Sequence, residues 1–143
     1  MTGVLLLDSD TLSEIARGHH RANETARAYL AEHGRFTFSA VTVFERLRGY
    51  REALRRGRPY EDHLKQFERL VEASIVLPFD AAAADRAARL WADCSAQARK
   101  GLGDLMIAAT AWANGLILVT RNRKDYAHFV KATAGALELT DWT

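Results

Sequence analysis

The segment Val4-Leu-Leu-Leu-Asp8-Ser-Asp10 runs through four consecutive apolar residues and then turns acidic. A short continuous apolar run is typical of a parallel strand that helices cover on both faces. In open parallel sheets, ligands bind outside the carboxyl ends of the strands. The segment therefore predicts a buried strand over residues 4–7, with Asp8 at the edge of the sheet where a site would form.

Further apolar runs along the chain resemble the first one, and longer helical patterns separate them. This alternation is the signature of an α/β fold, and we expect a central, mainly parallel sheet of four to five strands between two layers of helices. A chain of 143 residues with 48% hydrophobic side chains has the size and core of one domain, spanning residues 1–143. The additional predicted strands are Phe36 to Phe38, Ser74 to Leu77, Leu116 to Val119 and, most weakly, Ala136 to Leu139.

Amphipathic helices are predicted between the strands. Asp80 can cap an alanine-rich helix that stops near Gly101. One side of this helix carries Ala84, Ala87 or Ala88, Trp91 and Cys94. Asn114-Gly115 is interpreted as a helix C-cap, because apolar residues at helical spacing precede it. The other helical stripes are Val43, Leu47, Tyr50 and Leu54; Leu64, Phe67, Leu70 and Val71; and Leu105, Ala108, Ala109 and Trp112.

Composition favours a cytoplasmic protein without a membrane segment. The N-terminus has no basic start and its apolar run is too short for an export signal. The longest uncharged stretch, Leu105 to Thr120, falls short of the roughly 20 residues that span a bilayer. Cys94 is the single cysteine, which fits a reducing compartment. A net charge of +2 permits a polyanionic partner without requiring one.

Five acidic residues stand out, and all but Asp8 have a plain structural alternative. Asp8 follows a buried strand, and Asp10 beside it could share the site or cap a helix. Glu45 lies within a helix and taken alone would be surface. Asp104 opens a helix that is otherwise apolar, where a carboxylate also suits the helix dipole. Asp125 follows the fourth predicted strand, where a helix cap is the alternative.

Right-handed crossovers in one parallel sheet would bring Asp8, Asp104 and the 122–125 loop to the same edge. Several carboxylates within a few ångströms cannot all stay ionised unless a cation compensates them. Oxygen ligands favour Mg²⁺ or Mn²⁺ over zinc. A hydrated Mg²⁺ is suited to activating water against phosphorus, so the pattern predicts phosphodiester hydrolysis.

Four segments in this order resemble the PIN-domain nucleases, and among them the VapC-type toxins of bacterial toxin-antitoxin pairs. The resemblance covers essentially the whole chain and implies a three-layer α/β/α PIN-like domain. The segments are Leu6-Leu-Asp-Ser-Asp-Thr-Leu-Ser-Glu14, Ser39-Ala-Val-Thr-Val-Phe-Glu-Arg-Leu-Arg-Gly49, Gly103-Asp-Leu-Met-Ile-Ala-Ala-Thr-Ala111 and Leu118-Val-Thr-Arg-Asn-Arg-Lys-Asp-Tyr126.

The resemblance implies a Mg²⁺- or Mn²⁺-dependent endoribonuclease that forms homodimers and is silenced by a cognate antitoxin. It carries the catalytic roles onto Asp8, Glu45 and Asp104, with Asp8 and Asp104 as metal ligands. Many relatives have Asn at position 10 and Asp at position 122, so this chain departs from them at both. The fourth catalytic acid is therefore predicted to be Asp125, with Asp10 and Asn122 as additional ligands.

Basic residues beside the predicted site could hold the RNA. Arg121, Arg123 and Lys124 follow the fourth strand and are predicted to bind RNA phosphates. The arginines between positions 46 and 58 alternate with acids such as Glu52, which favours a solvated helix face for most of them.

Two rival functions use the same acids. In a phosphoryl-receiver signalling module, Asp8 and Asp10 would hold Mg²⁺ while Asp80 accepted phosphate and Thr120 acted as a switch. An aspartyl-phosphate phosphatase would use Asp8 as nucleophile and Asp10 as acid, although the spacing to Thr11 is one residue short of that pattern.

Overall fold

The structure is a computed structural model that describes residues 3–143. Met1 and Thr2, part of the N-terminal segment predicted not to be an export signal, lie outside the described residues. Within the described part of the chain, no helix combines the length and the apolar character needed to cross a membrane.

A five-stranded parallel sheet forms the centre of the molecule, in the order β3-β2-β1-β4-β5. The first strand is therefore central, and it pairs with β2 on one side and β4 on the other, with Leu6 level with Thr37 and Leu118. The strands are β1 (Leu5–Leu7), β2 (Thr37–Ser39), β3 (Ile75–Leu77), β4 (Ile117–Val119) and β5 (Leu139–Thr140).

The predicted strands are confirmed, with boundaries displaced by one to three residues. The largest displacement is at β5, which was predicted over Ala136 to Leu139 and is observed at Leu139–Thr140. That strand is short and half-buried, so its hydrophobic pattern marked it weakly. The prediction of a mainly parallel sheet with four to five strands is correct.

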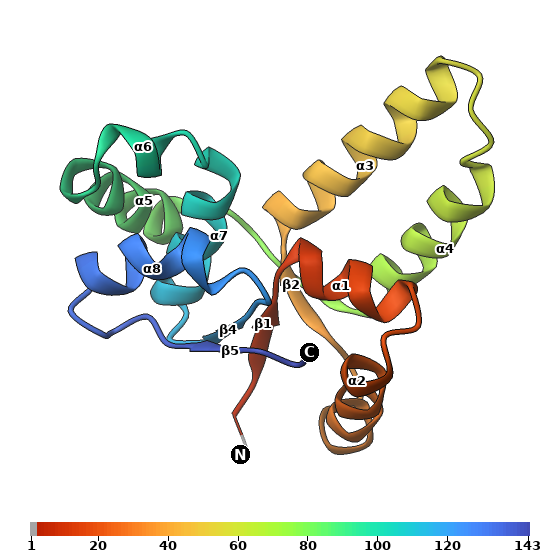
Figure 1. The fold of residues 1–143 in the computed structure, drawn as a ribbon, viewed down its shortest axis with the longest axis horizontal. Coiled ribbons are helices and arrows are strands. Elements are labelled where there is room, and N and C mark those ends of the chain that lie inside the picture. The colour runs from red at the N-terminus through yellow and green to blue at the C-terminus, as the bar shows by residue number, and fades with distance from the viewer. Residues whose placement is uncertain (1–2) are drawn as a thin grey trace.

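Helices cover the two faces of the sheet, with α1 to α4 on one side and α5 to α8 on the other (Figure 1). The polypeptide thus forms three layers, as the α/β/α prediction requires. The helices are α1 (Ser9–Ala16), α2 (His20–His33), α3 (Ala40–Arg55), α4 (Glu61–Glu72), α5 (Ala81–Asp93), α6 (Ala96–Arg99), α7 (Leu102–Ala113) and α8 (Arg123–Ala132).

Each face of the sheet has its own hydrophobic core. Leu6 and Leu118 point into the core shared with α5, α7 and α8. Leu5, Leu7 and Val119 point into the opposite core, which α1, α2 and α4 complete. Both faces of β1 are buried, which explains why its residues are apolar without alternation.

The alanine-rich helix departs from its prediction at its end and on its buried face. Asp80 caps it as predicted, but the helix ends at Asp93, and Ser95 starts the separate short helix α6. Ala87 is buried as predicted, but the other buried residues are Ala83 and Leu90, one position before the predicted Ala84 and Trp91. Trp91 is consequently 44% exposed, so its assignment to the core was wrong.

The segment Asn114-Gly115 ends α7 as predicted. Asn114 is the C-cap, and Gly115 adopts the left-handed conformation with φ +64° that suits glycine at this position.

Candidate active site

A cavity of about 220 Å³ opens at the carboxyl end of β1, and four carboxylates line it. They come from helices that follow β1 and β2 and from the first turn of α7, so the fold gathers side chains that are distant in the sequence. The lining residues are Asp8, Ser9, Asp10, Glu45, Asp104, Ile107 and Tyr126. Asp8 and Asp104 therefore share one space, as the model of a common site requires.

Asp8 is 2% exposed and lies between β1 and α1. Its Oδ1 accepts a hydrogen bond of 2.8 Å from the backbone N–H of Thr11 and caps the helix. Burial raises the pKa of Asp8 to about 6, against the lowering effect of hydrogen bonds from the Thr120 and Thr11 side chains and the Thr11 backbone. The negative charge of Asp10 raises it further.

Asp104 enters the cavity from the first turn of α7. The hydroxyl of Tyr126, a residue only 1% exposed, donates a hydrogen bond of 3.2 Å to its Oδ1. Burial raises the pKa of Asp104 to about 6; the Tyr126 hydrogen bond lowers it, and the charges of Asp125, Glu45 and Asp10 raise it. Two acids in one cavity thus have raised pKa values, which is common at functional sites.

Glu45 reaches the cavity from the second turn of α3 and lies directly against α7. A Cβ atom on Gly103 would overlap Glu45 Oε2, so a glycine at 103 leaves the space that the carboxylate occupies. Partial burial raises the pKa of Glu45; the charge of Arg48 lowers it, and those of Asp10 and Asp8 raise it.

Asp10 lies at the exposed rim of the cavity, in the first turn of α1. The alternative role considered for it, the helix cap, belongs to Asp8. The side-chain amide of Asn122 donates a hydrogen bond to Asp10 Oδ2. Partial burial raises the pKa of Asp10, and the negative charge of Asp125 raises it further. The positive charges of Arg121 and Arg17 lower it.

The predicted fourth acid, Asp125, does not line this cavity. It is exposed in the first turn of α8 and lines an adjoining recess with Lys124 and Asp104. Its charge still raises the pKa of Asp104 and Asp10. The catalytic role of Asp125 remains a prediction.

The three basic residues predicted to bind RNA lie at the start of α8 and just before it. Arg123 and Lys124 are exposed. Arg121 pairs with the buried carboxylate of Glu14, but the Arg121 side chain remains 47% exposed. Of the earlier arginines, Arg46 turns inward and donates hydrogen bonds of 2.8 Å to the hydroxyls of Ser13 and Tyr50.

The residues that a phosphoryl-receiver module would need, Asp8, Asp10 and Asp80, do not line one cavity. Asp80, the proposed phosphate acceptor, follows the edge strand β3 and is not among the residues lining the acidic cavity. Its Oδ1 accepts a hydrogen bond of 3.0 Å from the backbone of Ala83 and caps α5.

The donor set of the cavity fits a hydrated Mg²⁺ or Mn²⁺ ion. All four ionisable groups entering from α1, α3 and α7 are carboxylates, which hard divalent ions prefer. Among residues 3–143, no group of three or more His, Cys, Asp or Glu side chains is arranged to bind one metal ion directly. Mg²⁺ keeps several waters and uses one or two carboxylates, so it needs no such set.

Two side chains beside the site have contacts that no sequence motif indicates. Tyr126 donates a hydrogen bond to Asp104, and Glu14 pairs with Arg121. A glutamate on the inner face of α1, four residues after Asp10, was a usable signal because a buried carboxylate needs a cationic partner. Nothing in the local sequence identified that partner as Arg121.

Comparisons with known proteins agree with this geometry. The family model described as PIN domain matches residues 5–131. A relative from Shigella flexneri, named tRNA(fMet)-specific endonuclease VapC, is 32% identical over 111 residues, which is 77% of this chain and 77% of the relative.

Solved structures share the fold. The DNA-bound VapBC structure from Salmonella typhimurium aligns with a TM-score of 0.76 at 24% identity, over 98% of each chain. VapBC2 from Rickettsia felis, bound to a promoter DNA fragment, aligns with a TM-score of 0.75 at 19% identity, over 99% of this chain and 100% of that one. Since the family model covers most of the sequence and three of the four predicted catalytic acids line one cavity, we conclude that the chain belongs to the PIN domain family.

Proposed function

We propose that this protein is a Mg²⁺-dependent endoribonuclease, with Mn²⁺ able to substitute, and that it is the toxin of a toxin-antitoxin pair. The observation that carries the proposal is the convergence of Asp8, Asp10, Glu45 and Asp104 on one cavity in a member of the PIN domain family. The VapC relative is named as an endonuclease that acts on tRNA(fMet), which supports RNA as the class of substrate.

Asp8 and Asp104 would hold the ion, because both carboxylates line the cavity and a cation there would favour their charged forms. Burial raises the pKa of each to about 6, so each would gain from such a cation. A bound divalent ion supplies an activated water and neutralises charge on the phosphate. Glu45 would accept a proton from the attacking water, since its carboxylate borders the same space and its pKa is raised. Asp125 would add negative charge from the adjoining recess.

Substrate binding requires cations beside the acids. Arg123 and Lys124 are exposed at the start of α8, and Lys124 lines the recess next to Asp104. They would hold RNA phosphates beside the acidic cavity. Arg121 can share this role through the part of its side chain that stays exposed.

The partners follow from the same family. The solved neighbours include VapBC structures and a toxin-antitoxin complex from Klebsiella pneumoniae, which supports a cognate antitoxin as partner. We propose that this antitoxin blocks the acidic cavity. We further propose a homodimer acting in the cytoplasm, in which residues 1–143 form one nuclease domain.

Cleavage of RNA by the purified protein tests the proposal. We expect endonucleolytic products with Mg²⁺ or Mn²⁺ and none with excess chelator, because the carboxylates need the ion to bind phosphate. Asp104→Asn should abolish cleavage while the circular dichroism spectrum stays native. Sequencing the RNA ends that appear after brief induction in cells would identify the substrate.

Equal cleavage by Asp104→Asn and by the unmodified protein would eliminate the metal-site model. Turnover of small phosphomonoesters with no cut RNA would instead support the phosphatase alternative.

A further inference from the structure

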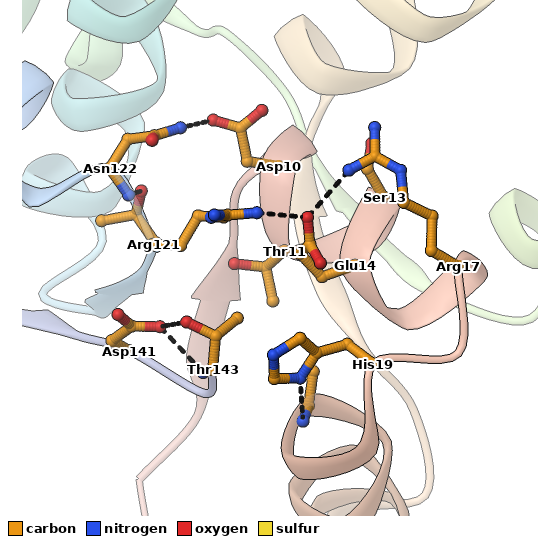
Figure 2. Close-up of polar contacts among 12 residues, drawn as sticks. Asp10, Thr11, Ser13, Glu14, Arg17, His19, Arg121, Asn122, Asp141 and Thr143 are labelled. Carbon is orange, nitrogen blue, oxygen red and sulfur yellow. Dashed lines mark hydrogen bonds and ion pairs between the residues drawn. The ribbon is translucent and has the colours of Figure 1, made fainter.

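An ion pair between a buried carboxylate and a half-exposed guanidinium joins helix α1 to the loop that follows β4. Glu14 is 6% exposed and lies on the inner face of α1. Arg121 Nη1 donates a hydrogen bond to Glu14 Oε1 at 2.5 Å, and Arg17 Nη1 donates to the same oxygen at 2.8 Å. Figure 2 shows both guanidinium groups pointing at this carboxylate, Arg121 from the loop and Arg17 from the helix itself.

The next residue of the loop makes a second connection to the same helix. Asn122 donates a side-chain hydrogen bond to Asp10 Oδ2, and Figure 2 shows its amide pointing at that carboxylate. Asp10 and Glu14 are four residues apart, so they lie on one face of α1. Neighbouring loop residues thus bind successive turns of the helix.

The Asn122 side chain makes no capping bond to α8, although it occupies the N-cap position. Its bond to Asp10 therefore depends on the path of the loop. The backbone N–H of Asn122 donates a hydrogen bond to the Thr120 hydroxyl, and its carbonyl accepts one from the backbone of Asp125. The Arg121 ion pair adds the link from the loop to α1, because it anchors the preceding residue to a carboxylate that burial makes costly to leave unpaired. Burial raises the pKa of Glu14, but the Arg121 hydrogen bond and charge, with those of Arg17, hold it below its ordinary value.

We propose that Glu14 and Arg121 are positioning residues, which hold the Asn122 amide on Asp10 and thereby orient the Asp10 carboxylate at the acidic cavity. Asn122 then serves the site as a hydrogen-bond donor, and Asp10, not Asn122, contributes the fourth oxygen donor of the cavity. The catalytic meaning of this arrangement rests on the proposed function, whereas the arrangement itself can be tested without metal or RNA.

The first test follows the Asn122 side-chain amide by NMR in ¹⁵N-labelled protein, with the signals assigned by their disappearance in Asn122→Asp. We expect Arg121→Met and Asp10→Asn each to move these signals toward those of a free amide. Arg121→Lys, which keeps the charge and a donor, should restore them largely. Unmoved signals in Arg121→Met would overturn the proposal.

Arg17→Met is the matched control. It removes a cation from the same Glu14 oxygen without touching the loop, and its side chain is 70% exposed. The Asn122 signals should stay in place. If Arg121→Met does not fold, the double variant Glu14→Gln/Arg121→Met removes both charges and still breaks the connection, so it replaces the single variant.

The second test measures Mn²⁺ binding by calorimetry in a double-mutant cycle. Arg121→Met should weaken binding roughly tenfold, the scale for losing a group that orients a ligand. In the Asp10→Asn background the same change should have almost no effect, because Arg121 acts through Asp10. Additive effects, or unchanged affinity in Arg121→Met, would refute the positioning role. If the unmodified protein binds no Mn²⁺, the proposed function fails, and the NMR result alone decides the positioning role.

Discussion

Asp8 and Asp80 occupy matching places in two parts of the molecule. Each lies between a parallel strand and a helix, and each caps that helix with Oδ1, to Thr11 at 2.8 Å and to Ala83 at 3.0 Å. Their surroundings differ, because Asp8 is 2% exposed and Asp80 is exposed. The same local structure therefore produces a cavity carboxylate in one place and a surface cap in the other.

The position of the strand in the sheet accounts for the difference. The central strand β1 has β2 and β4 as neighbours, so α3 and the loop after β4 close over its end. The strand before Asp80, β3, pairs only with β2 in the sheet and lies at its edge. A carboxylate becomes part of a site when other elements converge on it, which a strand end at the centre of the sheet allows.

The largest expected contrast between the two acids is in catalysis. Asp8→Asn should lower RNA cleavage by at least about 100-fold, because it removes a charge that would hold the metal. Asp80→Asn should leave cleavage unchanged, since asparagine also caps helices and the residue lies outside the cavity. Cleavage rates at saturating Mg²⁺ measure both variants, and a comparable loss in Asp80→Asn would void the comparison.

An intermediate effect is expected from the closure of α7 over the cavity. Gly103→Ala would place a methyl group where Glu45 Oε2 lies, so the carboxylate must move. We expect cleavage to fall on the order of tenfold, with little change in the melting temperature because a glutamate side chain is flexible.

Gly101→Ala is the matched control for this change, because its methyl group would lie 3.5 Å from Asp104 Oδ2, an ordinary contact. Its cleavage rate should stay near that of the unmodified protein. Equal losses in both variants would show that general disturbance of the start of α7, not the displacement of Glu45, lowers the rate.

The smallest expected effect is on stability. Because the folded pKa of Asp8 is about 6, above its ordinary value of 3.8, its contribution to stability is present below pH 3.8 and is lost as the pH rises through 6. Asp8→Asn keeps a capping oxygen and has no charge to bury. Without metal, it should therefore melt above the unmodified protein at pH 7, by on the order of 5 °C, and not at pH 4.

Thermal melts in chelator at the two pH values check this expectation. Asp80→Ala, measured alongside, should melt lower at pH 7 by a few degrees, since it loses a helix cap worth about 1 kcal/mol. A lower melting temperature for Asp8→Asn at pH 7 would mean that the charge of Asp8 stabilises the fold.

The sheet and part of the site could be predicted because local patterns encode them. The continuous apolar runs identified the strands, and Asp8 stood out because it follows one of them. Glu45 and Asp104 needed the family resemblance, since a helical carboxylate taken alone resembles surface. Their convergence on one cavity follows the predicted crossovers.

The remaining contacts join residues whose relation appears only in three dimensions. Tyr126 and Asp104 come from different helices. Glu14 lies in α1, and its partner Arg121 lies in the loop after β4. The face of α5 was misjudged because a run of alanines provides little contrast between its sides, and the wrong set placed Trp91 in the core. In each case the packing of distant elements decides what the local sequence leaves open.

The pairing of β1 with β4 also governs when this protein can become active during its synthesis. The Thr11 hydroxyl donates a hydrogen bond to the Val119 carbonyl across 108 residues of sequence. Asp104 lies in α7, the helix that directly precedes β4. A chain still growing on the ribosome therefore lacks the second wall of the acidic cavity until α7, β4 and the start of α8 have emerged. The proposed nuclease cannot be assembled beside the RNA that encodes it before the segment from Asp104 to Tyr126 has been translated.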